Sequence, residues 1–158
     1  MLSLDALVGA RAVSAYSALP GEISTSAIVR ALLDRAVTVV LPRASGAELA
    51  LHRVSAQTPL VAGPWQVLEP PEGAPAIAAG AIDLFLVPGL LFDRRGRRLG
   101  RGGGHFDRLL ARARPGAWFV GVCHASRVVD ALPEDPWDVR MHRIVSTAEV
   151  IVIERGGE

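Results

Sequence analysis

Lysine is absent from this sequence, and all 17 basic residues among its 158 are arginines. Without lysine the chain cannot form a lysine Schiff base with a carbonyl substrate. It also cannot place a P-loop lysine, or any other lysine, on the phosphates of a nucleotide. Composition alone therefore excludes these enzyme mechanisms.

Cysteine and long apolar runs are also scarce. The single cysteine, Cys123, cannot form an internal disulfide, which is typical of a protein from a reducing compartment. No N-terminal segment combines basic residues, a long apolar run and a small-residue cleavage site. The apolar runs are far shorter than the roughly 20 residues that a membrane span needs. We therefore expect a cytoplasmic protein with no membrane partner.

The rest of the composition is that of a folded domain. Half of the residues are hydrophobic and 21% are charged, which supplies a sizeable core and argues against disorder. A chain of this length suits one domain, so we treat residues 1–158 as a single unit.

Apolar patterns and turn residues predict short strands separated by helices. We expect strands at 11–19, 37–41 (ending at Pro42), 48–54 and 82–87, then at 118–123 and once or twice within 144–153. We expect helices near 28–35 and 105–113, with an N-cap region at 24–26, a weakly helical stretch at 3–10, a long surface connection at 55–81 and a loop at 90–104. This pattern indicates an α/β fold with a mainly parallel sheet covered by helices on both faces.

The segment from Asp93 to Arg108 concentrates positive charge. It holds six arginines and two aspartates, a local charge of +4 in a chain whose net charge is +1. Gly100, Gly102, Gly103 and Gly104 lie close together in the same segment. Glycines allow consecutive amides to point at an anion, arginines match phosphate or carboxylate, and a following helix would add its partly positive N-terminus. We therefore predict a phosphate-binding loop.

Other interpretations of this loop remain open. It can be a flexible turn with a solvated charged surface, and the same charge would also attract an RNA backbone. A Rossmann fingerprint starting at Gly100 is excluded, because it requires glycine where His105 stands. A Walker A loop is excluded by the absence of lysine.

Residues 87–112, VPGLLFDRRGRRLGRGGGHFDRLLAR, resemble the FD-x-x-G-x-RLG-x-G-x-GYYDR segment of 5-formyltetrahydrofolate cyclo-ligases. Outside this segment, SAYSALPGEIST, VVLPR, GPWQVLEPP and LPEDPWDVRMHRIVST resemble other parts of the family in the same order. The resemblance covers roughly residues 11–150. It implies an α/β fold of the NagB/RpiA/CoA-transferase-like type.

The resemblance also implies an activity. It is the ATP-dependent conversion of 5-formyltetrahydrofolate to 5,10-methenyltetrahydrofolate, with release of ADP and phosphate, in a monomer or homodimer that uses Mg²⁺. The alternative is a non-catalytic relative that binds a folate, a nucleotide or RNA through the Arg/Gly loop.

Site residues follow from the resemblance position by position. The implied nucleotide-binding residues are Arg98, Leu99, Gly100, Arg101, Gly102, Gly103, Gly104, His105 and Phe106. The implied folate-binding residues are Glu22, Trp65, Arg101, Gly102, Gly103, Gly104 and His105. Arg101 and His105 are the implied catalytic residues, and Asp107 and Asp138 the implied Mg²⁺ ligands.

Four of these residues also have a purely structural interpretation. Asp107 lies where a carboxylate stabilises the first turn of a helix, Asp138 follows Pro136 in a turn, and Glu22 follows a Pro-Gly turn. Without the resemblance, the residues themselves favour these structural roles. Trp65 near a Gly-Pro turn is as often a packing residue, and we interpret Cys123 as a buried small hydrophobe and not as a nucleophile.

The sequence departs from the family in three places. His105 and Phe106 replace the tyrosine pair, His142 stands where aspartate is common, and the family's N-terminal basic helix of the form K-x-x-x-R is not found. Removing one positive group from a transferring phosphate can cost on the order of 10³-fold in rate. We therefore expect this chain to bind ATP–Mg²⁺ weakly and to turn over slowly or not at all. If it turns over at ordinary enzyme rates, Arg97 or Arg11 is the candidate substitute for the helix.

Overall fold

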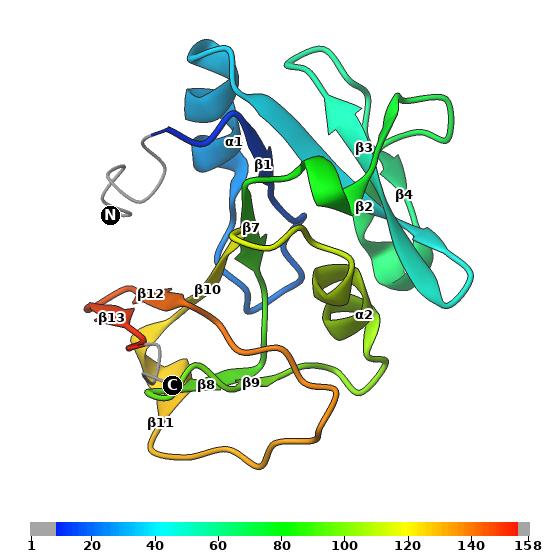
Figure 1. Ribbon diagram of the computed structural model, residues 1–158. Coiled ribbons are helices and arrows are strands. Elements are labelled where there is room, and N and C mark those ends of the chain that lie inside the picture. Colours follow the sequence, from blue (N-terminus) through cyan, green and yellow to red (C-terminus); the bar gives the residue numbers. More distant parts are fainter. Residues whose placement is uncertain (1–8, 155–158) are drawn as a thin grey trace.

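The computed structural model describes residues 9–154 and places eight strands in one sheet, in the order β13-β12-β10-β7-β1-β2-β3-β6 (Figure 1). These strands are β1 (Ala12–Ser14), β2 (Thr38–Ser45), β3 (Glu48–Val54), β6 (Ala76–Ile77), β7 (Leu84–Val87), β10 (Trp118–Cys123), β12 (Arg143–Ser146) and β13 (Val150–Val152). The five central strands from β12 to β2 pair in parallel. The outer strands β13, β3 and β6 pair antiparallel, so the prediction of a mainly parallel sheet is confirmed.

Helices cover both faces of this sheet, as predicted. Helix α1 (Ser26–Asp34) packs Leu32 into one apolar cluster, which includes Leu84 and Leu86 of β7. Helix α2 (His105–Ala111) packs Leu109 and Leu110 into the cluster on the other face, which includes Phe85 and Val87. Successive β7 side chains therefore alternate between the two clusters, and a strand buried on both faces is continuously apolar.

Pro42 does not end its strand, contrary to the sequence-based prediction. It lies inside β2 and pairs with Leu51 of β3. The pairing of β1 with β2 ends at Val40, whose carbonyl accepts the amide of Ala15. Because backbone groups alternate along a strand, the nitrogen of Pro42 faces this same side, where β1 no longer pairs. The missing N–H therefore costs no ladder hydrogen bond.

The two long connections contain more structure than the sequence indicated. The 55–81 connection contains the short pair β4 (Val61–Ala62) and β5 (Leu68–Glu69), two 3₁₀ turns (Pro64–Gln66 and Ala79–Ala81) and the edge strand β6. The 90–104 loop contains β8 (Leu91–Asp93) and β9 (Arg98–Leu99), which form a three-stranded sheet with β11 (Val128–Val129), just after the 3₁₀ turn Ala125–Arg127. Such two- and three-residue strands are set by tertiary pairing and leave little periodic signal.

Two further expectations concern the ends and the membrane. Residues 3–8 of the expected N-terminal helix lie outside the described residues, and Gly9 and Ala10 are not helical. None of the helices between residues 9 and 154 has the length and apolar character to span a bilayer.

Gly121 of β10 offers a test of the core packing. A Cβ atom built there would lie 2.4 Å from the Phe92 ring, whereas one built at Gly80 would meet nothing within 4 Å. Overpacking of a filled core costs about 1–3 kcal/mol, so we expect Gly121→Ala to lower the free energy of unfolding by this amount. Urea denaturation measures it, with Gly80→Ala as the matched control. Equal stability of the two variants would contradict the packing described here.

Candidate active site

A cleft of about 670 Å³ lies at the carboxyl ends of the central parallel strands. Residues that follow β1 line it, as do Pro88, Gly89 and Leu90, which follow β7. Ligand crevices of open α/β sheets lie at this edge. Every site residue implied by the resemblance lines this single cleft. These residues are Glu22, Trp65, Arg98, Leu99, Gly100, Arg101, Gly102, Gly103, Gly104, His105, Phe106, Asp107 and Asp138.

The glycine segment enters the cleft as an open loop between β9 and α2. Gly102 and Gly104 have φ values of 94° and 68°, which side-chain-bearing residues rarely adopt. Among the described residues, the amides of residues 100–104 make no backbone hydrogen bond. Helix α2 has only seven residues, so the groups that this loop offers to an anion are its open amides and arginine side chains, more than a helix dipole.

Arg98, at the start of the glycine loop, is fixed by buried polar contacts. Its side chain is only 6% exposed, its guanidinium lies 3.3 Å from the carboxylate of Asp107, and it donates to the carbonyl of Pro88 at 3.2 Å. It also lies over the ring of Phe106, 5.8 Å from its centroid. Burial lowers the pKa of Arg98, and the nearby carboxylates of Asp107 and Asp138 oppose that shift. Arg98 is therefore a buried, paired cation, unlike the open Arg101.

Arg101 extends into the cleft toward Glu22. Its side chain is 53% exposed, and its guanidinium lies 3.7 Å from the Glu22 carboxylate. The other carboxylate oxygen of Glu22 accepts the amide of Leu19 at 2.8 Å, which fixes Glu22 at the turn after β1. A weakly paired arginine at the loop is a ready partner for a phosphate or carboxylate.

Trp65 and His105 both line the cleft and contact each other. Their rings are in edge-to-face contact with centroids 5.7 Å apart. Trp65 and Gln66 have φ values of 57° and 61°, and the indole of Trp65 is largely exposed. A left-handed conformation at a non-glycine residue costs of order 1–3 kcal/mol and often marks a ligand-binding position. Trp65 therefore presents an aromatic surface to the cleft at some conformational cost.

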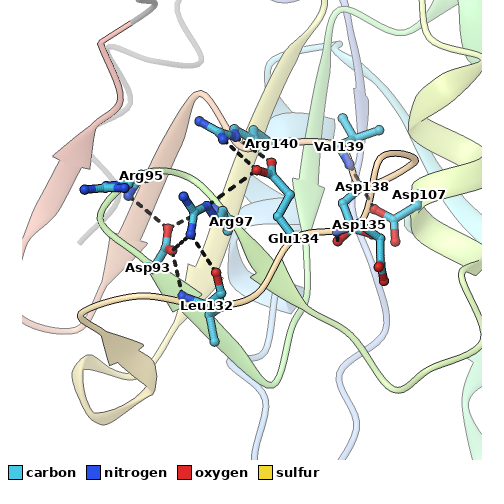
Figure 2. Close-up of polar contacts among 10 residues, drawn as sticks. All are labelled: Asp93, Arg95, Arg97, Asp107, Leu132, Glu134, Asp135, Asp138, Val139 and Arg140. Atoms are coloured by element: carbon cyan, nitrogen blue, oxygen red, sulfur yellow. Dashed lines mark hydrogen bonds and ion pairs between the residues drawn. The ribbon is translucent and has the colours of Figure 1, made fainter.

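The carboxylates of Asp107, Asp135 and Asp138 line the cleft. Asp107 accepts the amide of Val139 at 3.2 Å, and Asp138 accepts the amide of Asp135 at 2.8 Å (Figure 2). No group of three His, Cys, Asp or Glu side chains between residues 9 and 154 surrounds a common metal position. Mg²⁺ beside a nucleotide commonly takes one or two carboxylates and completes its shell with phosphate oxygens and water, so this arrangement fits it.

Comparison with known proteins shows which family the chain belongs to. Residues 1–147 match the model of the 5-formyltetrahydrofolate cyclo-ligase family. The chain belongs to this family. It is 34% identical to the 5-formyltetrahydrofolate cyclo-ligase of Mycolicibacterium smegmatis over 94% of this chain and 79% of that protein. It is 27% identical to the Escherichia coli cyclo-ligase over 95% of this chain and 85% of that protein.

Solved structures give the same result for the fold. The 5,10-methenyltetrahydrofolate synthetase of Aquifex aeolicus superposes with a TM-score of 0.84 at 31% identity, over 99% of this chain and 78% of that one. The synthetase of Mycoplasma pneumoniae, at 21% identity, shares the fold with a TM-score of 0.70 over 96% of this chain and 78% of that one.

Sequence reasoning missed some cleft residues and placed others wrongly. Asp135 and Trp137 line the cleft, and their position within the LPEDPWDVRMHRIVST segment of the family was the signal that could have indicated them. The expected substitutes for the basic helix do not line it. Arg97 binds the carbonyl of Leu132, and Arg11 precedes β1, at the edge of the sheet away from the cleft.

Alkylation of Cys123 tests the interpretation of this residue as a buried side chain and not as a nucleophile. It ends β10 as a buried side chain, and burial raises the pKa of its thiol to about 11, with Arg127 opposing the shift. Because the thiolate is the reactive form, we expect alkylation at pH 8 to be about 100-fold slower in the native chain than in the unfolded one. Iodoacetamide labelling measures this. Equal rates would contradict the buried position.

Proposed function

We propose that this chain converts 5-formyltetrahydrofolate to 5,10-methenyltetrahydrofolate with ATP, releasing ADP and phosphate. The observation that carries the proposal is the convergence, in one cleft, of open glycine amides, an accessible arginine, carboxylates and an exposed aromatic ring. Family membership and relatives named cyclo-ligases support the same activity.

In the proposed reaction, the formyl oxygen of the folate attacks the γ-phosphorus of ATP, and ADP leaves. The N10 nitrogen of the folate then attacks the activated formyl carbon and loses its proton to water, and phosphate leaves as the ring closes. Little covalent participation of the protein is needed, because positioning and charge neutralisation lower both barriers.

The loop residues supply that positioning. The amides of residues 100–104 would bind phosphate oxygens, and Arg101 would neutralise charge on the transferring group. Asp107 and Asp138 would hold Mg²⁺, which supplies charge neutralisation on the phosphates when bound. Arg98 would keep Asp107 in place through their 3.3 Å ion pair.

The folate would lie between Trp65, His105 and Glu22. Trp65 offers a flat apolar surface for the pterin ring, and its edge contact with His105 orients both rings. Glu22 can accept hydrogen bonds from ring nitrogens, because its carboxylate is held by Leu19 and lines the cleft. His105 can donate or accept a proton near the formyl group according to its protonation.

We expect Arg101→Ala to weaken nucleotide binding roughly tenfold, because a charge-assisted hydrogen bond is worth about 1.5–3 kcal/mol. Isothermal calorimetry with ATP and Mg²⁺ measures this. Arg94→Ala is the matched control, because Arg94 belongs to the same arginine-rich segment, pairs with Glu149 and does not line the cleft. Unchanged affinity of Arg101→Ala would remove Arg101 from the nucleotide site.

Catalysis itself is tested by following the absorbance of methenyltetrahydrofolate with and without ATP. Within residues 9–154, Arg98 and Arg101 are the arginines that line the cleft, and Arg98 is already paired with Asp107. We therefore expect ATP-dependent product at a rate below about 1 s⁻¹, the lower end of ordinary enzyme turnover. Ligand binding without any product would identify a non-catalytic relative, and faster turnover would show that another group supplies the charge.

A further inference from the structure

The connection between β11 and β12 lines the cleft although it contains no helix or strand. Residues 130–142 form this connection, and four of them line the cleft: Pro133, Asp135, Trp137 and Asp138. In Figure 1 it runs as a long orange loop past β9 and α2. Such a segment has few hydrogen bonds of its own, so its position depends on attachments to the rest of the protein.

The first attachment is the buried carboxylate of Asp93, which ends β8. Asp93 is fully buried, and one of its oxygens accepts the amides of Arg95 and Arg97 at 2.9 and 3.0 Å. Its other oxygen accepts the amide of Leu132 at 2.9 Å. A buried carboxylate must be satisfied by donors, and here two donors close the β8–β9 turn and the third belongs to the connection.

Arg97 makes the second attachment. Its guanidinium donates to the carbonyl of Leu132 at 2.7 Å and lies 3.6 Å from the carboxylate of Glu134. Glu134 in turn accepts two hydrogen bonds from Arg140, both at 2.6 Å. The two ends of the segment from Glu134 to Arg140 are thus closed by one bidentate pair, which Arg97 contacts from the β8–β9 turn (Figure 2).

The closed segment carries Asp138, one of the two candidate Mg²⁺ ligands, and a further carboxylate of the cleft, Asp135. Asp135 and Asp138 lie between Glu134 and Arg140, and the amide of Val139 reaches the Asp107 carboxylate at 3.2 Å. Figure 2 shows Asp135 and Asp138 beside Asp107, on the side of Glu134 that is away from Asp93. Asp93, Arg97 and Glu134 do not themselves line the cleft.

We propose that Asp93, Arg97 and Glu134 are positioning residues that hold the 132–140 segment so that Asp135 and Asp138 lie beside Asp107 for Mg²⁺–nucleotide binding. The metal part of this inference rests on the proposed function, whereas the anchoring of the segment does not. Partners that orient metal ligands typically contribute 10–100-fold to metal affinity.

The chain offers a matched pair of glutamates for the test. Glu134 and Glu149 each accept two hydrogen bonds from one arginine, and in each case that arginine lowers the pKa of the carboxyl group. Glu149 pairs with Arg94 near β13, away from the cleft. Glu134→Ala and Glu149→Ala therefore remove the same charge and the same kind of exposed ion pair. Only Glu134→Ala removes a contact within the 132–140 segment.

The first measurement is hydrogen exchange of the native chain. We expect Glu134→Ala to raise the exchange of the Leu132 and Val139 amides about tenfold, while the amides of β10 stay protected. Glu149→Ala should leave the Leu132 and Val139 amides unchanged. Glu134→Gln, which keeps one acceptor, should give an intermediate increase. Unchanged exchange in Glu134→Ala would overturn the anchoring role.

The second measurement is Mg²⁺ titration of ADP binding by calorimetry. We expect about tenfold weaker Mg²⁺ binding in Glu134→Ala, a smaller loss in Glu134→Gln and none in Glu149→Ala. Equal losses in Glu134→Ala and Glu134→Gln, with unchanged exchange, would show an effect of charge alone and overturn the proposal. If the unaltered chain does not bind Mg²⁺–ADP, the proposed function fails, and the exchange result still decides the anchoring.

Asp93→Asn tests the centre of the network. An amide group at this position keeps one acceptor oxygen but presents a donor to the amide of Leu132, so we expect increased exchange at Leu132. Because this change also leaves a buried polar group unsatisfied, it can unfold the chain, and the exposed Glu134 variants keep the proposal decidable in that case.

Discussion

Parallel pairing of β1, β7 and β10 brings the carboxyl ends of three central strands to one edge of the sheet, and the rest of the site depends on this constraint. Because these strands run in the same direction, the segments that follow them all begin at the same end of the sheet, where they can contribute residues to the cleft. The turn after β1 brings Glu22, and the hairpin after β7 brings Arg98 and the glycine loop. Glu22 and Arg101, which are distant in the sequence, therefore meet without any long-range sequence signal.

Charge is arranged unevenly within this cleft. Arg98 is buried and committed to Asp107, and it contributes to the shape of the loop. Arg101 is half exposed and only weakly paired with Glu22, which leaves it available to a ligand. The two arginines are three residues apart in the sequence, and their different burial gives them different tasks. Both side chains carry one positive charge, so composition alone does not distinguish their roles.

The part of the cleft wall formed by residues 61–69 has its own constraint. Gly63 lies against the buried carboxylate of Glu69, which accepts the amide of Ala44 at 3.0 Å and pairs with Arg43. This contact ties the 61–69 segment to β2, and Trp65 at its tip adopts a left-handed backbone conformation. Conformational cost at an exposed aromatic residue is consistent with a surface kept for binding.

The sequence by itself determined the α/β class, the helices on both faces, the family and the Arg/Gly loop. Apolar periodicity and the motif from Phe92 to Arg108 carry these features, because both depend on residues close together in the chain. Only the tertiary structure decided the short strands of residues 55–81 and 90–104, the place of Pro42 inside β2, and the position of Arg97. Each of these depends on a partner strand or carboxylate distant in sequence, and local propensity holds no information about such a partner.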